Sequence, residues 1–304
     1  MVYIYNIYNK TCKIFEEIKW ISFTIPALVF YLSFFIIPSL SSVYYSFTDW
    51  NGLNSNFIGL RNYADMLKDK MIISSLSNTL FYTICITLLQ NTVGLFFAII
   101  LSKKWMKNVF VLRALFFLPY IISTLVLGYV WSFILEPNLG PIKQILRLLH
   151  LDFLTFDWLG NAVVARFMIV VFTVWQCFGY NMVIFLAGLS AIPDELYEAG
   201  HIDGVNSFNE FKHITFPLLA PSFTINIMLT TMGCLKLFDQ VYALTGGGPG
   251  YSTDSIATTI YNLGFRNDSR WGYGTSMSIV LFIFILLVSA ILVNYLRGRE
   301  VEIY

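Results

Sequence analysis

The stretch EAGHIDGVNSFNEFKHITFPLLAP, residues Glu198–Pro221, is a polar segment between two long apolar runs of the chain. Proline at position 193 and the two acids after it are typical of a helix start. Proline at the first helical position loses no hydrogen bond, and acids in the first turn suit the helix dipole. We therefore expect a helix over Pro193–Asp203 that ends at Gly204, a favourable left-handed cap.

A second short helix is expected directly after this turn. Ser207 and Glu210 have the spacing of a capping box, which marks a helix start. Pro217 and Pro221 follow where the chain turns into the next apolar run. Residues 193–221 are thus predicted to form a helix–turn–helix elbow at the membrane surface, within a single domain of residues 1–304.

The composition of the chain indicates lipid as its solvent. Of the 304 residues, 57% are hydrophobic and only 12% are charged, whereas a soluble domain has about 25% charged residues. The net charge of +1 leaves no broad basic surface for nucleic acid. The cysteines show no CxxC spacing and no metal-ligand pattern, so we interpret them as packing thiols; they are Cys12, Cys85, Cys177 and Cys234.

Long apolar runs predict an all-α, polytopic membrane protein. A helix needs about 20 apolar residues to cross a bilayer core, and six stretches of the chain qualify. They are Ile21–Thr48, Leu80–Ser102, Ala114–Leu135, Phe167–Ile192, Phe216–Leu244 and Tyr273–Leu296. The elbow then lies between the fourth and fifth transmembrane helices. The first run is too long for the core of a signal peptide, so we expect it to be retained.

Basic residues near the ends of the runs predict the orientation, because they favour the cytoplasmic side. One set of connecting segments carries Lys10, Lys13, Lys19, Lys103, Lys104, Lys107, Arg113, Lys212, Arg297 and Arg299. The other set has longer loops and carries Arg61, Lys68, Lys70, Lys143, Arg147, Arg166, Arg266 and Arg270. This bias places both termini and the elbow in the cytoplasm.

The elbow carries residues of a known signature. Glu198-Ala199-Gly200 and Asp203-Gly204, with the later residues Phe211, Ile214, Pro217, Leu218 and Pro221, resemble the EAA signature of ABC importer permeases. Gly200 departs from the usual alanine, and Phe216 departs from the usual leucine. The match falls at the predicted place, between the fourth and fifth spans, which is the structural context that such a motif needs.

The resemblance covers nearly the whole chain and is narrower at three further stretches. Phe238–Pro249, Phe57–Tyr63 and Gly272-Tyr273-Gly274 are similar to the carbohydrate-uptake branch of these permeases. That branch includes the larger maltose-transporter membrane subunit and the first glycerol-phosphate permease. The glycines at 246–248 and 250 lack the lysine and hydroxyl partners of a phosphate loop, so we interpret them as a tight external turn near a docked binding protein.

The chain contains no GxxxxGK[ST] sequence, so it has no ATP cradle of its own. The resemblance implies that the elbow docks into a groove of a separate ATPase subunit, which binds ATP and Mg. The coupling residues would be Glu198, Ala199, Gly200, Asp203 and Gly204, with apolar support from Leu196, Ile202 and Val205. The alternative is an amphipathic surface helix whose acids face water. His201 and His213 are interpreted as interface residues, since their spacing does not fit a zinc pair.

Polar side chains in the middle of the spans mark candidates for the substrate path, because they are costly in lipid unless used. Gln176 and Tyr180 lie four residues apart and are expected to share one face of the fourth span. Thr230, Cys234 and Leu237 follow Asn226 at helical spacing on the fifth. The alternative is interhelical hydrogen bonding, the role that we expect for Gln90 and Asn91. Lys236 and Asp239 are expected to pair with each other or to face the outer interface.

These observations predict the permease subunit of an ATP-driven ABC importer for sugars, with no catalytic residue, metal or cofactor of its own. The resemblance implies a second related permease, a pair of ATPase subunits and an external sugar-binding protein, in a bacterial or archaeal cytoplasmic membrane. An ion-coupled secondary transporter would need buried ionisable residues in the spans, and most spans have none. A membrane enzyme would need a ligand cluster or a nucleophile with its base. Glycerol-phosphate would need a strongly basic pocket, so a neutral oligosaccharide is preferred.

Overall fold

The computed structural model describes residues 23–103, 106, 108–151, 156–267 and 270–298. Within these ranges the chain is helical, and extended backbone pairs only at one isolated bridge between Thr48 and Phe57. The fold is all-α, as predicted. Cys12 and the basic residues Lys10, Lys13, Lys19, Lys104, Lys107 and Arg299, on which part of the orientation rests, lie outside the described residues.

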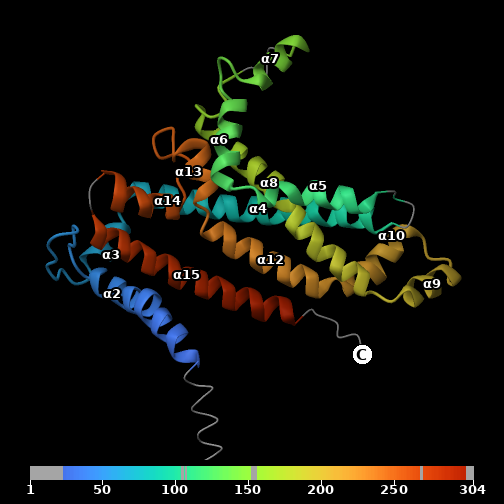
Figure 1. Ribbon diagram of the computed structural model, residues 1–304, viewed down its shortest axis with the longest axis horizontal. Coiled ribbons are helices and arrows are strands. Elements are labelled where there is room, and N and C mark those ends of the chain that lie inside the picture. Colours follow the sequence, from blue (N-terminus) through green and yellow to red (C-terminus); the bar gives the residue numbers. More distant parts are fainter. Residues whose placement is uncertain (1–22, 104–105, 107, 152–155, 268–269, 299–304) are drawn as a thin grey trace, which may run out of the picture.

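The helices follow one another along the chain with short connections (Figure 1). The first helix, Phe23–Tyr45, includes the π-helical turn η1 (Leu32–Ile36) and α2 (Ile37–Tyr45). The other helices are α3 (Arg61–Met66), α4 (Lys70–Ser102), α5 (Val109–Ile121), α6 (Thr124–Ile134), α7 (Pro141–Leu148), α8 (Ala162–Ala191), α9 (Asp194–Ile202), α10 (Ser207–Glu210), η3 (Phe211–Thr215), α11 (Phe216–Leu218), α12 (Ala220–Leu235), α13 (Asp239–Thr245), α14 (Ile256–Tyr261), η4 (Asn262–Asn267) and α15 (Trp271–Arg297).

Four helices of the described chain are each long and apolar enough to cross a membrane: Phe23–Tyr45, α4, α8 and α15 up to Leu296. Two further spans are bent pairs of helices. One is α5 with α6, and the other is the Ser207–Leu218 segment with α12. Counting each bent pair as one span gives up to six. The structure therefore agrees with a polytopic membrane protein and corrects the shape of two of its spans.

The predicted third run, Ala114–Leu135, is not one continuous helix. The axes of α5 and α6 meet at 93°, and Ile122 between them is extended, with φ −74° and ψ 141°. Pro119 lies inside α5, close to this break, where it removes a backbone donor. As a result, α6 and α7 project away from the bundle (Figure 1).

The predicted fifth run, Phe216–Leu244, is also interrupted. The helix α12 ends at Leu235 and spans 16 residues, about 24 Å at 1.5 Å per residue, which is less than the hydrocarbon core of a bilayer. After a break at Lys236 the chain continues into α13, which packs on α6: Ser132 Oγ lies 3.2 Å from the carbonyl oxygen of Leu244 and donates to it. The apolar pattern could not show this break, because the residues on both sides of it are apolar.

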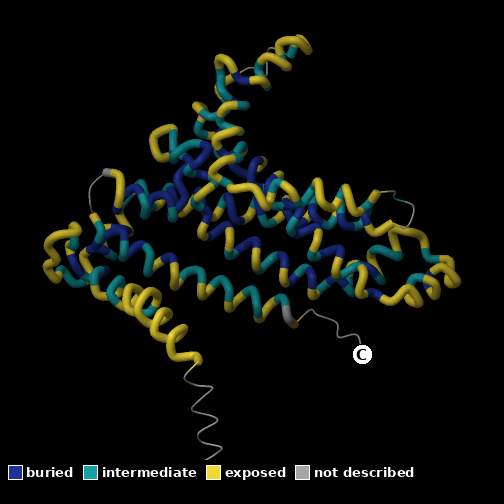
Figure 2. The backbone as a smooth tube through the Cα atoms, in the orientation of Figure 1, coloured by how far each residue is buried: buried dark blue, intermediate teal, exposed yellow. Residues whose placement is uncertain are grey.

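The core of the bundle lies where α4 and α8 cross. Tyr82 and Ile86 of α4 are buried against Ile169 and Phe172 of α8, and Val241 of α13 completes the cluster. Figure 2 shows buried residues along these helices, whereas the first helix is exposed along its length. Its most apolar window has no buried residue at all. A helix of this composition in that position faces lipid or another chain.

Close helix contacts require glycine at two positions of this core. A Cβ atom on Gly94 of α4 would lie 2.9 Å from the Cβ of Asn181 on α8. A Cβ atom on Gly179 of α8 would overlap the backbone carbonyl of Phe116 on α5. Small residues that let backbones approach are the usual means of packing helices in lipid, where no hydrophobic effect drives them together.

We expect Gly179→Ala to lower the stability of the purified chain, because the methyl group must displace the α5 backbone. Overpacking of this kind costs about 1–3 kcal/mol. Gly274→Ala on α15 is the matched control, since a Cβ there meets its nearest atom at 3.7 Å and should be neutral or slightly stabilising. Thermal unfolding in detergent measures both, and equal midpoints for the two variants would contradict the assigned contact.

Candidate functional site

The first arm of the elbow, α9, has a well-formed start and end. Pro193 is its N-cap, and Asp194 and Glu195 lie in its first turn. At its end Gly204 has φ +73°, Gly204 N donates to His201 O at 3.1 Å, and Val205 N donates to Gly200 O at 3.0 Å. These bonds are those of a Schellman motif. The predicted left-handed cap at Gly204 is confirmed.

The second arm begins differently from the prediction. Its N-cap is Asn206, whose side-chain oxygen accepts a hydrogen bond from Asn209 N at 2.9 Å. The expected capping box of Ser207 with Glu210 is therefore wrong. Asparagine is as good a cap as serine, and it lies one residue earlier, which leaves the Glu210 side chain free to reach the first arm.

Three contacts hold the two arms together. His201 Nε2 lies 3.7 Å from Glu210 Oε2, and Tyr197 Oη lies 3.2 Å from Thr215 Oγ1. Gly200 is buried, and a Cβ there would lie 3.0 Å from Ile214 Cδ1. An alanine there would require the terminal methyl group of Ile214 to shift slightly. The elbow is consequently a braced unit.

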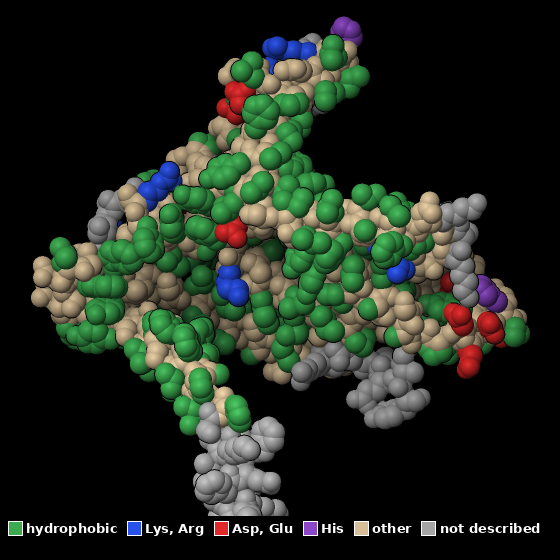
Figure 3. All heavy atoms as spheres, viewed as in Figure 1, with side chains coloured by type: hydrophobic (Ala, Val, Ile, Leu, Met, Phe, Trp, Pro, Cys, Tyr) green, Lys and Arg blue, Asp and Glu red, His purple; other side chains and the backbone are tan. Residues whose placement is uncertain are grey.

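The outer surface of the elbow combines acids with exposed apolar side chains. Glu198, Ala199, Asp203 and Gly204 are all exposed. Large apolar side chains are also exposed there: Ile202 is 86% exposed, Phe208 71% and Leu196 40%, while Val205 is half-buried. Figure 3 shows acidic side chains gathered at the α9 end of the molecule. The outer surface of the elbow therefore carries both carboxylates and exposed apolar side chains.

The two histidines of the elbow have local partners. His201 faces Glu210, and His213 Nδ1 lies 3.0 Å from the carbonyl oxygen of Asn209 in its own helix. Among the described residues no three His, Cys, Asp or Glu side chains are grouped so that they could hold a metal ion.

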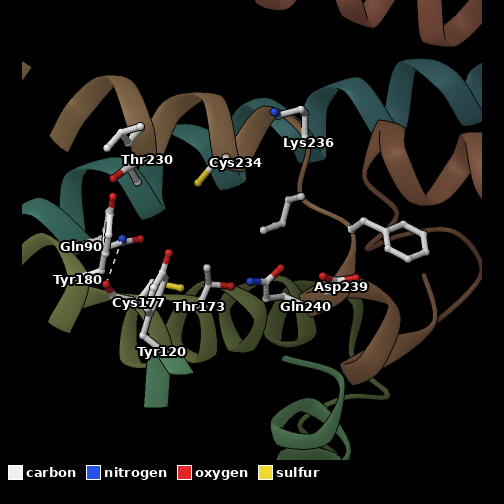
Figure 4. A pocket seen from close by; sticks show the side chains of 14 residues that line it. Gln90, Tyr120, Thr173, Cys177, Tyr180, Thr230, Cys234, Lys236, Asp239 and Gln240 are labelled. Carbon is white, nitrogen blue, oxygen red and sulfur yellow. Dashed lines mark hydrogen bonds between the residues drawn. The ribbon is translucent and has the colours of Figure 1, made fainter. Parts of the chain in front are cut away.

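A cavity of about 380 Å³, lined by both polar and apolar side chains, lies between α4, α5, α8 and the α12–α13 break (Figure 4). Cavities of this order accommodate small ligands. Its walls are formed by Gln90, Tyr120, Thr173, Cys177, Tyr180, Leu229, Thr230, Gly233, Cys234, Lys236, Leu237, Phe238, Asp239 and Gln240. The rings of Tyr120 and Tyr180 are stacked, with centroids 4.8 Å apart and planes at 21°. They form an aromatic face that carries hydroxyl groups.

Most of the predicted path residues line this cavity, but Gln176 does not. Tyr180, Thr230, Cys234 and Leu237 are among its walls. Gln176 is 2% exposed, and its Nε2 donates to Thr124 Oγ1 at 3.0 Å, at the start of α6. Consecutive helical residues differ by about 100° in direction, so a neighbour of the cavity residue Cys177 points to a different side of α8. Gln176 braces the break between α5 and α6.

The cavity also has lining residues that sequence reasoning missed. Thr173, Cys177 and Tyr180 are spaced i, i+4, i+7, which is the spacing of one helix face, and this pattern could have found the first two. Tyr120 and Gln240 carried no comparable signal. Tyr120 lies near the end of α5, and Gln240 lies in the first turn of α13.

A network of amides joins α4, α8 and α12 beside the cavity. Gln90 Nε2 donates to Asn181 Oδ1 at 2.5 Å, and Asn181 Nδ2 donates to Thr230 Oγ1 at 3.0 Å and to Asn91 Oδ1 at 3.3 Å. Asn226 Nδ2 donates to the carbonyl oxygen of Asn181 at 3.2 Å. The expected interhelical bonding of Gln90 and Asn91 is confirmed, although Gln90 also lines the cavity.

Lys236 and Asp239 depart from the expected pairing. Both side chains are exposed and line the cavity, and no ion pair joins them among the described residues. Figure 4 shows Asp239 beside Gln240 on one side of the cavity and Lys236 on the other. The break between α12 and α13 separates the two residues, which a continuous helix would have placed on one face.

The glycine-rich segment after α13 is a turn that is held against α4 by hydrogen bonds. Tyr82 Oη donates to Thr253 O at 2.9 Å, and Asn78 Nδ2 donates to Ser252 O at 2.8 Å. Asp254 is buried, and burial raises the pKa of its carboxyl, while a hydrogen bond from Thr258 Oγ1 at 2.7 Å and the charge of Arg266 lower it. This turn is therefore a fixed part of the fold.

Residues 90–300 match the family described as "binding-protein-dependent transport system inner membrane component". The chain belongs to this family. It is a transport permease and a multi-pass component of the inner membrane, and the matched region contains both the elbow and the cavity.

Relatives and solved structures agree with this assignment. The chain is 35% identical to a probable permease protein for starch degradation products from Thermoanaerobacterium thermosulfurigenes, over 96% of this chain and 99% of the relative. It is 34% identical to a trehalose/maltose transport system permease protein from Thermococcus litoralis, over 91% and 92%. Its fold is similar to a chain of a bacterial ABC transporter that imports alginate, with a TM-score of 0.82, 20% identity and coverage of 94% and 99%.

Asn181→Leu should destabilise this permease, because the change removes the side-chain bonds of the amide network and leaves its partners buried without them. Interhelical hydrogen bonds in membranes are worth about 0.6 kcal/mol each and up to about 1.7, so we expect a loss of about 1–3 kcal/mol. Thr92→Ala on the exposed face of α4 is the control and should stay within about 0.5 kcal/mol. Thermal unfolding in detergent measures the difference, and identical midpoints would show that the network contributes nothing.

Proposed function

We propose that this permease is a subunit of an ATP-driven importer for sugars and that its elbow is the contact with a separate ATPase subunit. The observation that carries the proposal is the braced elbow, whose motif residues Glu198, Ala199, Asp203 and Gly204 are exposed beside Ile202. Glu198 and Asp203 offer carboxylates to basic residues of a groove, and Ile202, Leu196 and Phe208 supply apolar contact. Rigid caps allow such a helix to transmit movement of its partner to the spans.

The cavity supports a sugar as the substrate. Sugars present hydroxyl groups on a ring with an apolar face, and they suit a site that combines an aromatic platform with hydrogen-bonding groups. The stacked Tyr120 and Tyr180 provide the platform, and Thr173, Thr230 and Gln240 provide polar groups. The relatives described above, named for starch degradation products and for trehalose and maltose, support the same class.

The complex requires further subunits. The alginate importer has been solved with its periplasmic protein bound, which supports an external binding protein as a partner here. We propose a second, related permease as the other half of the pathway and a pair of ATPase subunits that bind ATP and Mg. Both termini and the elbow are then cytoplasmic, and the clamped turn at 246–255 faces the binding protein.

Glycerol-phosphate as the substrate and ion coupling as the mechanism both agree less well with the structure and the family. A glycerol-phosphate would meet one cationic side chain in the cavity, Lys236, and one carboxylate, Asp239, which is not a basic site for a dianion. An ion-coupled transporter would need buried ionisable residues within the spans, and the family is described as part of a binding-protein-dependent system.

Glu198→Lys should weaken the contact with the ATPase subunit, because it places a cation against a basic groove. Losing one partner of a buried charged pair at an interface costs about 2–5 kcal/mol. We expect less ATPase subunit to copurify and basal hydrolysis to lose its response to sugar-loaded binding protein. Glu195→Lys, also exposed but in the first turn of α9, is the control and should do less. Full copurification and full stimulation with Glu198→Lys would refute the docking role.

Gly204→Val tests the cap of the elbow. Valine at φ +73° is strained by about 1–3 kcal/mol, so the α9 end should loosen and coupling should fall. Gly59→Val is the control, because Gly59 also has a positive φ of +61° with no neighbour within 4 Å but lies far from the elbow in the chain. Equal loss of sugar-stimulated hydrolysis in both variants would assign the effect to general strain.

The chain purified without partners should neither hydrolyse ATP nor transport sugar in liposomes, since it carries no nucleotide-binding sequence. The assay compares phosphate release by the chain alone with that of the assembled complex. ATP hydrolysis by the isolated chain above the protein-free background would contradict the proposal that a separate subunit hydrolyses ATP.

A further inference from the structure

We infer that Lys236, Asp239 and Gln240 form a polar wall of the cavity that selects uncharged, hydroxyl-rich substrates over acidic ones. The inference rests on the proposed function, because it assigns substrate selection within the same cavity. These residues come from the α12–α13 break and the first turn of α13.

The break places Asp239 and Gln240 beside Thr173 of α8 and Lys236 across the cavity from them (Figure 4). Thr173, Cys177 and Tyr180 lie on α8, whereas Asp239 and Gln240 approach from α13; in Figure 4 the Gln240 side chain points toward Thr173. Lys236 approaches from the end of α12. Figure 3 shows one acidic and one basic side chain beside a hollow in the middle of the face that it displays. A ligand in this cavity therefore lies between Lys236 on one side and Asp239 and Gln240 on the other.

The side chains of the wall are free to bind a ligand. Asp239 and Lys236 make no ion pair among the described residues, and both are exposed. An ionised carboxylate only accepts hydrogen bonds, an ammonium only donates them, and an amide does both. A sugar hydroxyl donates and accepts, so it can satisfy all three groups. Bonds to charged groups are the stronger ones.

The opposite charges set the selectivity. Lys236 and Asp239 together carry no net charge. A neutral substrate can therefore hydrogen-bond to both side chains without adding a charge to the cavity. A carboxylate of the substrate is attracted by Lys236 and repelled by Asp239, so an acidic substrate gains no net electrostatic attraction to offset the cost of its desolvation. Removing one charge should therefore shift the preference in a direction that depends on which charge is removed.

The test is equilibrium binding to the detergent-purified complex without its binding protein, so that only the permease selects. The neutral probes are trehalose, maltose, cellobiose and maltotriose, and the acidic probe is the α-1,4-linked trimer of galacturonate. We expect wild type to bind at least one neutral probe more tightly than the acid. Asp239→Asn should weaken that neutral probe about 10-fold, the loss of one charged hydrogen bond, and should strengthen the acid. Lys236→Gln should weaken both.

Controls separate selection from folding. Asp65→Asn and Arg61→Gln make the same charge changes in the exposed pair on α3 and should leave all binding unchanged. Asp239→Glu keeps the charge and should retain the preference for the neutral probe. A loss of folding lowers binding of every probe together, so it does not produce opposite changes for the two classes.

The outcomes distinguish the two proposals. If wild type binds no neutral probe, the proposed sugar function and this inference both fail. If wild type binds a neutral probe but Asp239→Asn changes the two classes in parallel or not at all, or Lys236→Gln changes neither, the sugar function stands and the selective wall is refuted.

Discussion

The crossing of α4 on α8 is the contact on which the rest of the structure depends. Gly94 allows the two backbones to approach, and Asn181 at the same crossing bonds to Gln90 and Asn91 of α4 and to Thr230 of α12. The hydrocarbon core of a bilayer contains no water, so polar groups there must form their hydrogen bonds within the protein. The crossing thus fixes three helices relative to one another and creates one wall of the cavity.

The broken helices follow from the same constraint. Free backbone groups at a break are tolerated at membrane depth only where they are buried in protein or line a wet cavity. The ends of α5 and α12 both reach the cavity, where Tyr120 and Lys236 lie. Gln176 of α8 stabilises the break between α5 and α6, because its Nε2 donates a hydrogen bond to Thr124 Oγ1. The helix ends at these breaks therefore place side chains in the cavity that continuous helices would direct elsewhere.

The elbow is stabilised in a different way from the spans, because its outer surface faces away from the bundle. Its stability comes from caps and from contacts between its arms, such as Tyr197 with Thr215 and Gly200 with Ile214. Those contacts leave Glu198 and Ile202 exposed. The elbow thus presents an exposed surface at one end of the bundle, while the cavity lies in the interior of the bundle.

The sequence by itself determined the spans, the helical class, the elbow and its cap at Gly204, since apolar length, helix punctuation and the EAA signature are local patterns. It also singled out Tyr180, Thr230, Cys234 and Leu237 as candidates for the substrate path, and these residues line the cavity. Tertiary structure alone decided that Gln176 braces α6, that Asn206 and not Ser207 caps the second arm, and that Lys236 and Asp239 stand apart in the cavity. The physical reason is that a break inside an apolar run leaves hydropathy unchanged but redirects every side chain beyond it.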